Sequence, residues 1–592
     1  MKQFLKYTLA SLIGTLLSFL VVFFILSGII ASIASFTAKD KTEVKDKSVL
    51  QIKLDKPIPE RTPVNPFASF NFNGLDEFNV LGLNDVRKQI ERAKTDDRIK
   101  GIYLDVTIIP SSMATIEAVR NSLKDFKESG KFIIAYSDVL SQKAYYLASL
   151  ADEIYISPSG MMDLRGMTMH VMFFKGLLEK LDVEMQVIRY GKFKSAVEPF
   201  IRDEMSEANE EQSRQYIEGI WGHLLKAVKE ERGVEIDKLN NIADSLLLRI
   251  PEDAVAHGLV DGIIYKDELF DTIRERAEIR EDSTPEFISL YKYYDSAPNK
   301  NNLSVDEKPG IAVVYAVGEI RSGEGDDDQV MGSERISRAI RKARRDSTIK
   351  AIVLRVNSPG GSGLASDIIW REVVLARKAK PVIVSMGDLA ASGGYYIACP
   401  ADRIFAQPTT LTGSIGVFGL LPNVQGLLNN KLGITIDGVK TNDHADFAHP
   451  YRPLSDFERD VLQENVNIFY MDFVEKVADG RNMSITQVKE IGEGRIWNGM
   501  DALKIGLIDE FGGMDDAIAA AATMAEVEDY DIVELPKLDD PFKKLFGSFG
   551  SSMRTRILRN ELGTTYRYFE ILKNTGEMEQ IQARLPFIYE IH

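Results

Sequence analysis

Gly387-Asp-Leu-Ala-Ala-Ser-Gly-Gly-Tyr-Tyr-Ile-Ala398 has the pattern of a strand-to-helix junction with one serine at its centre. The apolar run before it, residues 381–386, predicts a short buried strand, and the small residues after Ser392 predict a helix. Ser392 is followed by Gly393 and Gly394. A serine in this setting can expose its hydroxyl beside backbone N–H groups, as an acyl-transfer nucleophile requires. A glycine-rich turn with no catalytic role fits the same pattern. Other parts of the sequence are needed to distinguish the two interpretations.

The chain contains an internal repeat that covers most of its length. Ile99-Lys-Gly-Ile-Tyr-Leu-Asp-Val106 matches Ile349-Lys-Ala-Ile-Val-Leu-Arg-Val356, and Ala144-Tyr-Tyr-Leu-Ala148 matches Gly394-Tyr-Tyr-Ile-Ala398, each pair 250 residues apart. Similarity at a fixed offset is the signature of a duplicated unit. Each copy alternates β-branched runs with helical patterns, which is typical of βαβ units. The sequence therefore predicts an α/β protein with two tandem homologous domains.

The individual elements of each copy follow from their patterns. A long helix is expected to begin near Ser206 in the first copy and near Ser455 in the second, where Ser455 and Glu458 form a capping box. The other elements expected in the second copy are strands at 311–317, 351–356, 381–385 and 403–406, and helices at 333–345 and 364–379.

Composition and a polar linker at 296–304 divide the chain into four parts. The tail matches no motif and is expected to be helical. The parts are a cytoplasmic start and transmembrane anchor at 1–38, an N-terminal α/β domain at 39–300, a C-terminal α/β domain at 309–535 and a helical tail at 536–592.

Bulk composition limits the classes of function. A chain of 592 residues is too long for one core. The net charge of −16 argues against nucleic acid as a partner. Cys399 is the single cysteine, so no internal disulfide can form. The six histidines form no HExxH or Cys/His cluster. We therefore expect no metal and no other cofactor.

The first forty residues predict a membrane anchor. Residues 7–38 contain no charge, whereas a membrane span needs about 20 apolar residues. This length favours a retained anchor over a cleaved signal peptide, although residues 31–35 offer a cleavage site, and over a buried core helix. Because Lys2 and Lys6 precede the span, the N-terminus is expected in the cytoplasm and the domains on the far side, the periplasm in a bacterium.

The two copies differ where chemistry is expected. The counterpart of Ser392 is Gln142, so the first copy lacks the candidate nucleophile. The loop Asn357-Ser-Pro-Gly-Gly-Ser362 also has no glycine in its counterpart. Glycines let a substrate approach the backbone, and N–H groups at a strand-to-helix junction favour an anion. Gly361 and Gly393 are therefore candidate oxyanion donors, unless the loop is a plain connection.

A serine nucleophile needs a base, and no histidine lies in the glycine-rich loops, although His444 or His449 could reach from elsewhere. Alignment of the two copies places Lys194 opposite Asp443. The lysine thus lies in the copy without the serine, and the serine in the copy without the lysine. This complementarity predicts a composite Ser–Lys site, within one chain or between chains; the alternative is a solvated surface lysine.

A lysine acts as a base only when it is neutral. Its reference pKa is about 10.4, and a useful base near neutral pH needs about 7–8, a shift worth roughly 4 kcal/mol. Desolvation at a domain interface can supply that shift. A hydroxyl would orient the amine, and Ser414, in Thr412-Gly-Ser-Ile-Gly416, is the candidate; its counterpart is Leu164. A turn serine without a role in the site is the alternative.

Four motifs together resemble the signal peptide peptidase A family, in its long, duplicated, membrane-anchored protease IV type. They are residues 357–362, 388–396 and 412–416 and Lys194-Ser-Ala-Val-Glu-Pro199. The resemblance covers residues 48–535 and the anchor. It implies two crotonase/Clp-protease-like domains built of ββα units, and a serine endopeptidase with a Ser–Lys dyad.

The resemblance also implies a role for each candidate residue. Ser392 is the nucleophile, Lys194 the general base and Ser414 the residue that orients the lysine; Gly393 and the Gly360-Gly361 loop are the oxyanion donors. Lys192 lies two residues before Lys194, and only the family motif selects between the two lysines.

The resemblance further implies a homotetramer on the outer face of the inner membrane. Its substrates would be signal peptides that remain in the bilayer, and its pockets would favour small and apolar side chains. Two other functions stay open on the residues alone. One is a crotonase-like enzyme that acts on acyl-CoA, and the other is a membrane-tethered scaffold without catalytic activity.

Overall fold

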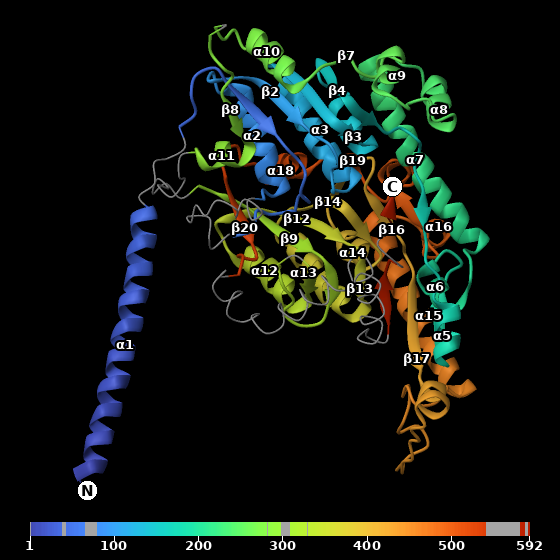
Figure 1. Cartoon of the computed structure of the whole chain (residues 1–592). Coiled ribbons are helices and arrows are strands. Elements are labelled where there is room, and N and C mark those ends of the chain that lie inside the picture. Colours follow the sequence, from blue (N-terminus) through green and yellow to red (C-terminus); the bar gives the residue numbers. More distant parts are fainter. Residues whose placement is uncertain are drawn as a thin grey trace.

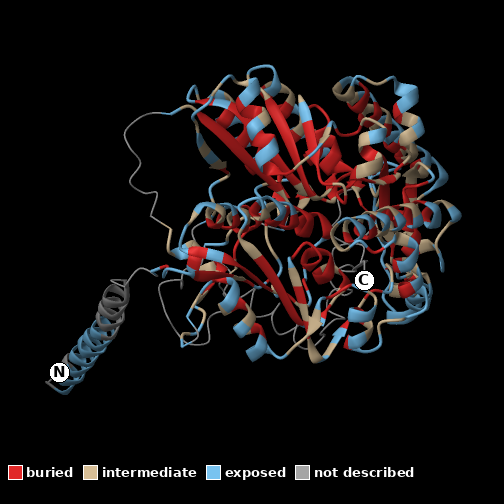
Figure 2. Ribbon diagram, turned by 90° about the horizontal axis from the view of Figure 1, so that it is seen from above, coloured by how far each residue is buried: buried red, intermediate tan, exposed pale blue. Residues whose placement is uncertain are grey.

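The computed structural model describes residues 2–37, 43–64, 80–280, 282–297, 308–327, 329–539, 581–585 and 590–591. Two α/β units pack against each other, and the long helix α1 (Lys2–Thr37) stands apart from both (Figure 1). Buried residues concentrate on the strands and the inner helix faces of both units (Figure 2). The prediction of two tandem α/β domains is confirmed.

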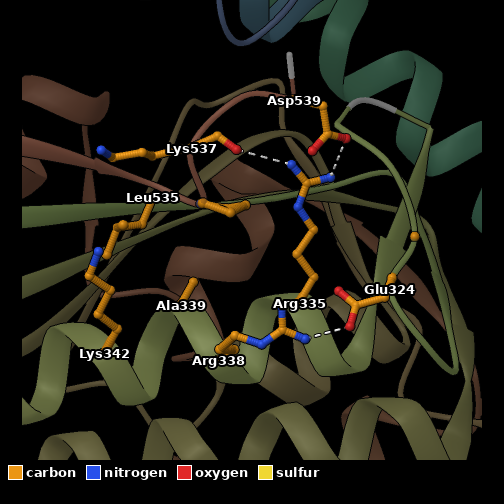
Figure 3. Close-up of a pocket in the computed structure, with 10 residues that line it drawn as sticks. Glu324, Arg335, Arg338, Ala339, Lys342, Leu535, Lys537 and Asp539 are labelled. Atoms are coloured by element: carbon orange, nitrogen blue, oxygen red, sulfur yellow. Dashed lines mark hydrogen bonds and ion pairs between the residues drawn. The ribbon is translucent and has the colours of Figure 1, made fainter. Parts of the chain in front are cut away.

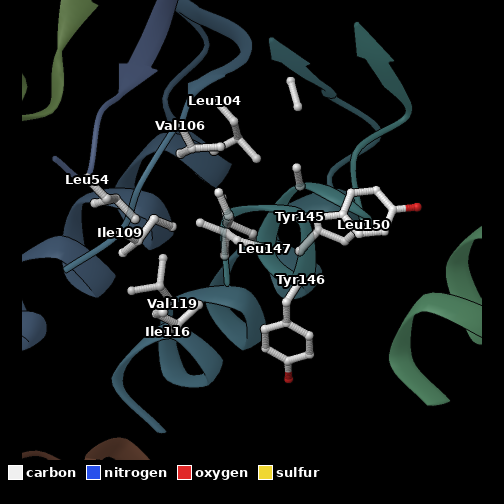
Figure 4. Packing of buried hydrophobic residues seen from close by; sticks show 14 of the residues in the cluster. Leu54, Leu104, Val106, Ile109, Ile116, Val119, Tyr145, Tyr146, Leu147 and Leu150 are labelled. Carbon is white, nitrogen blue, oxygen red and sulfur yellow. The ribbon is translucent and has the colours of Figure 1, made fainter. Parts of the chain in front are cut away.

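The first unit is built on a parallel sheet with strand order β7-β4-β3-β2-β1-β8. Side chains from β2, α3 and α4, such as Leu104, Val119 and Leu147, pack together in its core (Figure 4). The strands are β1 (Ser48–Ile52), β2 (Ile99–Asp105), β3 (Phe132–Leu140), β4 (Glu153–Met162), β7 (Gly262–Ile263) and β8 (Phe287–Ser289). The helices are α2 (Leu83–Thr95), α3 (Met113–Lys127), α4 (Gln142–Ala148), α8 (Ile236–Asp244), α9 (Pro251–Ala256), α10 (Lys266–Arg276) and α11 (Leu290–Asp295).

The second unit repeats this plan in a sheet ordered β18-β16-β14-β12-β9-β20, with β15 paired to β14 and β19 paired to β15. Its strands are β9 (Gly310–Val317), β12 (Ile349–Ser358), β14 (Val382–Ala391), β15 (Arg403–Ala406), β16 (Leu411–Gly413), β18 (Ile496–Asn498), β19 (Glu510–Phe511) and β20 (Asp531–Leu535). Its helices are α12 (Ser333–Arg345), α13 (Gly363–Arg377), α14 (Gly393–Ala398), α16 (Ile485–Ile491), α17 (Gly499–Lys504) and α18 (Met514–Met524).

A third sheet, ordered β11-β10-β13-β21-β17-β6, joins the two copies. Strand β6 belongs to the first copy and pairs antiparallel with β17 of the second, from Tyr190↔Val417 to Glu184↔Asn423. The strands of this sheet are β6 (Glu184–Tyr190), β10 (Glu319–Arg321), β11 (Val330–Gly332), β13 (Gly360–Ser362), β17 (Val417–Asn423) and β21 (Gln582–Arg584). The short helices of this region are α5 (Lys175–Leu181), η2 (Ser195–Val197), α6 (Glu198–Ile201) and η3 (Leu427–Leu432).

The long helix expected in each copy is present as α7 (Glu207–Arg232) and α15 (Asp456–Arg481). Ser455 caps α15 and forms the predicted capping box with Glu458. The strands and helices expected in the second copy overlap β9, β12, β14, β15, α12 and α13, because each is set by a local hydrophobic period. Strand β14 is longer than expected and continues to Ala391 instead of ending at residue 385.

The expectation of a helical tail is wrong where the tail is described. Gln582–Arg584 is strand β21, and Glu590–Ile591 is strand β22, which pairs with β5 (Met169–His170). Residues 540–580 and 586–589 lie outside the described residues. Strand β21 forms because β13 and β17 supply hydrogen-bonding partners on both sides, and such distant partners leave no mark in the local sequence.

Helix α1 has the length and composition of a membrane span. Its segment Lys6–Phe24 has 19 residues and a mean hydropathy of 2.1, and none of it is buried in the protein. About 20 apolar residues are needed to cross a bilayer. It is the one such helix in the described part of the chain, and it suggests membrane anchoring.

Candidate active site

Ser392 occupies a strained turn between β14 and α14. Its backbone angles are φ 55° and ψ −114°, which a non-glycine residue adopts at a cost of about 1–3 kcal/mol. The turn is held in place because the Ser392 N–H donates to Gly413 O and the Tyr396 N–H donates to Ser392 O, both at 2.8 Å. The strand-to-helix junction predicted from the sequence is therefore present, with the serine fully buried.

The structure brings Lys194 to this serine within one chain. Lys194 Nζ lies 2.8 Å from Ser392 Oγ and 3.0 Å from Ser414 Oγ. Only 1% of Lys194 is exposed to solvent. The candidate nucleophile, the candidate base and the candidate orienting hydroxyl thus form one buried cluster, contributed by both copies of the repeat.

Burial sets the charge of this lysine. Desolvation lowers the pKa of Lys194 well below its ordinary value, and no other cause contributes to the shift. A buried ammonium without a counter-ion is unfavourable, so the uncharged amine is the stable form over a wider pH range than in a solvated lysine. An uncharged amine can accept a proton from the neighbouring hydroxyl.

Two features hold the Lys194 backbone against the second copy. The β6–β17 pairing ends four residues before Lys194, and the Phe193 N–H then donates to Glu493 O at 3.1 Å. A Cβ on Gly494 would lie 2.7 Å from Lys194 Cα, so only glycine fits this contact. Gly494 also has φ +85°, a conformation that other residues rarely adopt.

Gln212 of α7 fastens the same junction. Its amide donates to Phe193 O at 3.0 Å and to Ser195 Oγ at 3.1 Å, and its oxygen accepts from the Ile496 N–H at 3.2 Å. Neither Gln212 nor Gly494 is predicted from the sequence. A glutamine on a long helix resembles a solvated residue, and no pattern marks it as buried.

Ser414 follows β16 and is also held in a left-handed conformation, with φ 52°. Its hydroxyl donates to Gly494 O at 3.2 Å, and its N–H donates to Arg495 O at 2.7 Å. With its hydrogen given to Gly494, the Ser414 oxygen is free to accept a hydrogen from the Lys194 amine. The geometry suits a residue that orients the lysine.

The glycine-rich loop faces a carbonyl group of the chain's own tail. Gly361 in β13 pairs with Ala583 in β21, and Gly360 has φ +92°. A Cβ on Gly360 would lie 2.2 Å from Ala583 O, and a Cβ on Gly393 would lie 2.9 Å from the same oxygen. All three candidate oxyanion glycines therefore lie beside one peptide segment, and side chains at Gly360 or Gly393 would displace it.

A separate cavity of about 320 Å³ lies at α12, away from this cluster (Figure 3). Both of its arginines are already paired: Arg335 bonds to Lys537 O and Asp539, and Arg338 bonds to Glu324. It contains no serine, cysteine or histidine. Within the described ranges, no group of three or more His, Cys, Asp or Glu residues is arranged to hold a metal ion.

Comparison with known proteins identifies the family. Residues 125–280 and 375–528 each match peptidase family S49, one match in each copy. Protease 4 of Haemophilus influenzae is 34% identical over 508 residues, which cover 83% of this chain and 82% of that protein. Protease 4 of Salmonella typhi is 38% identical over 77% of this chain and 74% of that protein.

A third relative is the chloroplastic serine protease SPPA of Arabidopsis thaliana, 33% identical over 86% of this chain and 74% of that protein. These relatives confirm the resemblance to signal peptide peptidase A that the four motifs indicated. The chain belongs to peptidase family S49 and is a serine peptidase with two tandem copies of the family's domain.

Proposed function

We propose that this chain is a membrane-anchored endopeptidase in which Ser392 is the nucleophile and Lys194 the general base. The observation that carries the proposal is the 2.8 Å separation of Lys194 Nζ and Ser392 Oγ in a pocket from which solvent is excluded. Residues 39–300 would be the domain that supplies the lysine, and residues 309–535 the domain that supplies the serine.

The reaction follows from these groups. Neutral Lys194 takes the proton of the Ser392 hydroxyl as Oγ bonds to the carbonyl carbon of the scissile peptide. Backbone N–H groups of Gly393 and of the Gly360-Gly361 loop stabilise the oxyanion. The Lys194 ammonium then gives its proton to the leaving amine, and an acyl-enzyme remains. Water then attacks the acyl group while the same amine takes its proton, and the resulting ammonium returns a proton to Ser392 Oγ as the ester bond breaks.

The tail strand β21 supports an extended peptide as the substrate. It lies between β13 and β17 in the third sheet, and its Ala583 carbonyl lies against Gly360 and Gly393. A substrate strand in this position would gain backbone hydrogen bonds from the sheet, independently of its sequence. An alanine beside the two glycines fits a preference for small side chains next to the scissile bond.

We further propose that the substrates are cleaved signal peptides and similar apolar peptides at the inner membrane. An anchor of the length of α1 would hold the domains at the bilayer surface. Lys2 and Lys6 favour a cytoplasmic N-terminus and periplasmic domains, since positive charge is retained on the cytoplasmic side.

We propose a homotetramer because the surface that α3 buries between the two copies has an exposed apolar counterpart on α13. In α3, Ala114 and Ala118 are buried and line a small cavity with Met386 of the second copy. Their counterparts on α13, Leu364 and Ile368, are 62% and 41% exposed. The apolar surface of α13 that corresponds to the buried surface of α3 is therefore left exposed within one chain.

The surface of the second copy that packs against α3 also has an exposed counterpart, in the first copy. Leu411 of the second copy is buried, whereas its counterpart Met161 in the first copy is 61% exposed. Met161 and the neighbouring Val139 would cover Leu364 and Ile368 of a second chain. Such a head-to-tail contact repeats from chain to chain and forms a ring where the rotation between chains closes; four chains is the number that the family resemblance implies.

The dyad is tested by the Ser392→Ala and Lys194→Met variants. Each should lower peptide cleavage by at least about 10³-fold, because nucleophile and base act in one step. A fluorophosphonate probe should label the unaltered chain and neither variant. Lys192→Met is the matched control, since Lys192 is the exposed lysine two residues earlier.

Cleavage that survives Ser392→Ala would reject the dyad. Turnover of an acyl-CoA, unaffected by the probe, would favour the crotonase-like alternative. If Lys192→Met and the unaltered chain are both inactive and unlabelled, a scaffold is the remaining function.

The lowered pKa of Lys194 predicts a pH dependence. Phosphonylation of Ser392 by the fluorophosphonate probe should become faster as pH rises through this pKa, well below the ordinary lysine range, because only the neutral amine is a base. Between the folded and the unfolded pKa the unfolded chain binds more protons, so the free energy of unfolding should also rise with pH. Lys194→Met should lack this component of stability. Equal slopes of stability against pH in both proteins would contradict a desolvated amine.

Deletion of residues 581–592 should vacate the position between β13 and β17. Because β21 lies where a substrate strand is proposed to bind, it should compete with a peptide substrate for the same backbone partners. The truncated chain should therefore cleave a short peptide with a KM about tenfold lower. Initial rates over a range of peptide concentrations measure this. A higher KM, or lost activity in a folded chain, would mean that β21 is part of the site's framework.

The head-to-tail contact is tested by Leu364→Glu combined with Ile368→Glu. Two charges in an apolar interface should dissociate the assembly, as measured by light scattering of the detergent-solubilised chain. Val255→Glu, an exposed apolar position on α9, is the control. An unchanged mass for the double variant would place the interface elsewhere.

A further inference from the structure

Helix α3 of the N-terminal domain begins against a residue of the C-terminal domain. Its N-cap residue, Ser112, makes no side-chain capping hydrogen bond. Instead, the Thr115 N–H donates to Asp388 Oδ1 and the Thr115 hydroxyl donates to Asp388 Oδ2, both at 2.8 Å. A carboxylate at a helix N-terminus satisfies a free N–H group and lies at the positive end of the helix dipole. Asp388, in β14, therefore caps a helix of the other copy.

The same helix holds a second segment of the C-terminal domain. Glu117 is buried, and its Oε2 accepts from the Thr409 hydroxyl at 2.6 Å and from the Thr409 N–H at 3.4 Å. Its other oxygen lies 2.7 Å from His223 Nε2, on α7. Thr409 stands two residues before β16. Glu117 therefore fixes the start of β16 to the frame of the N-terminal domain.

Asp388 and Thr409, the two residues that α3 contacts, each lie a few positions before one of the two serines of the site. Asp388 precedes Ser392 by four residues, and Thr409 precedes Ser414 by five. Strands β14 and β16 pair in parallel, and the Ser392 N–H donates to Gly413 O. A strand rises about 3.3 Å per residue, so each anchor lies within roughly 17 Å of its serine along a stiff segment. A shift of either anchor would move a serine relative to Lys194.

These anchors are not a shared property of the duplicated fold. The counterpart helix α13 is capped by its own Ser362, which accepts from the Ala365 N–H at 3.2 Å. Asp367, the counterpart of Glu117, bonds to Tyr396 and Lys476 within its own copy. The links from α3 to the strand ends therefore occur where the first copy meets the second.

We infer that Asp388 and Glu117 are positioning residues, which act through α3 to keep Ser392 and Ser414 within reach of Lys194. The inference rests on the proposed Ser–Lys dyad. Neither residue touches the reacting atoms. Asp388 holds β14 four residues before Ser392, and Glu117 holds the segment that leads into β16. The first copy, which lost its own serine, then contributes both the base and the element that aligns the nucleophile with it.

The Thr115→Val and Thr409→Val variants test this inference, because each removes one hydroxyl and keeps the side-chain shape. We expect kcat for peptide cleavage to fall about tenfold or more in each, since small misplacements of reacting groups cost up to about 10²-fold. KM should stay close to its original value, and fluorophosphonate labelling of Ser392 should slow in parallel with kcat. Thr115→Ser and Thr409→Ser restore the hydroxyl and should restore both rates.

Thr272→Val on α10 is the matched control, because the Thr272 hydroxyl bonds within its own helix. Unaltered kcat in both valine variants would overturn the inference. So would a loss of kcat that the serine variants do not restore, since packing alone would then explain it. The proposed dyad is judged separately by Ser392→Ala: if that variant is inactive while the valine variants are fully active, only the positioning role of α3 fails.

Discussion

This structure depends on one constraint: water must be excluded from the Lys194 amine at the interface between the two domains. An ammonium group in such a pocket lacks the hydration that stabilises it in water, and desolvation alone accounts for the lowered pKa of Lys194. The pocket can stay dry only if both copies close it without gaps. Gly494, whose backbone meets the Lys194 main chain directly, and Gln212, which bridges Phe193 and Ile496, show how closely the walls are joined.

Duplication has separated the tasks of the two copies. The second copy carries the strained turn at Ser392 and the glycines at 360, 361 and 393, whose backbone can approach a peptide. The first copy has Gln142 where the serine would be, and its amide oxygen accepts from the backbone N–H groups of Arg165 and Gly166 instead. The position of the proposed nucleophile in one copy is thus occupied in the other by a structural hydrogen-bonding partner. The first copy is free to supply the lysine and the helix that meets β14 and β16.

The sequence was most informative where a property is local or repeated. Hydrophobic periods predicted the elements of the second copy, and the fixed offset between copies predicted the tandem architecture. The juxtaposition of Lys194 and Ser392 was predicted because each copy lacks what the other has; their catalytic roles remain a prediction. The strand β21, the cap of α3 by Asp388 and the bridge by Gln212 depend on partners far away in the chain. Such contacts leave no period in the sequence, so only the structure reveals them.

The pairing of β6 with β17 has a consequence for how the protein is made. As the nascent chain leaves the ribosome, β6 is complete long before β17 exists, so the first copy has an open strand edge while the second is still being synthesised. An unpaired edge invites pairing with other chains. The first copy is therefore exposed to wrong pairing until the second copy has been synthesised and β17 covers the edge of β6.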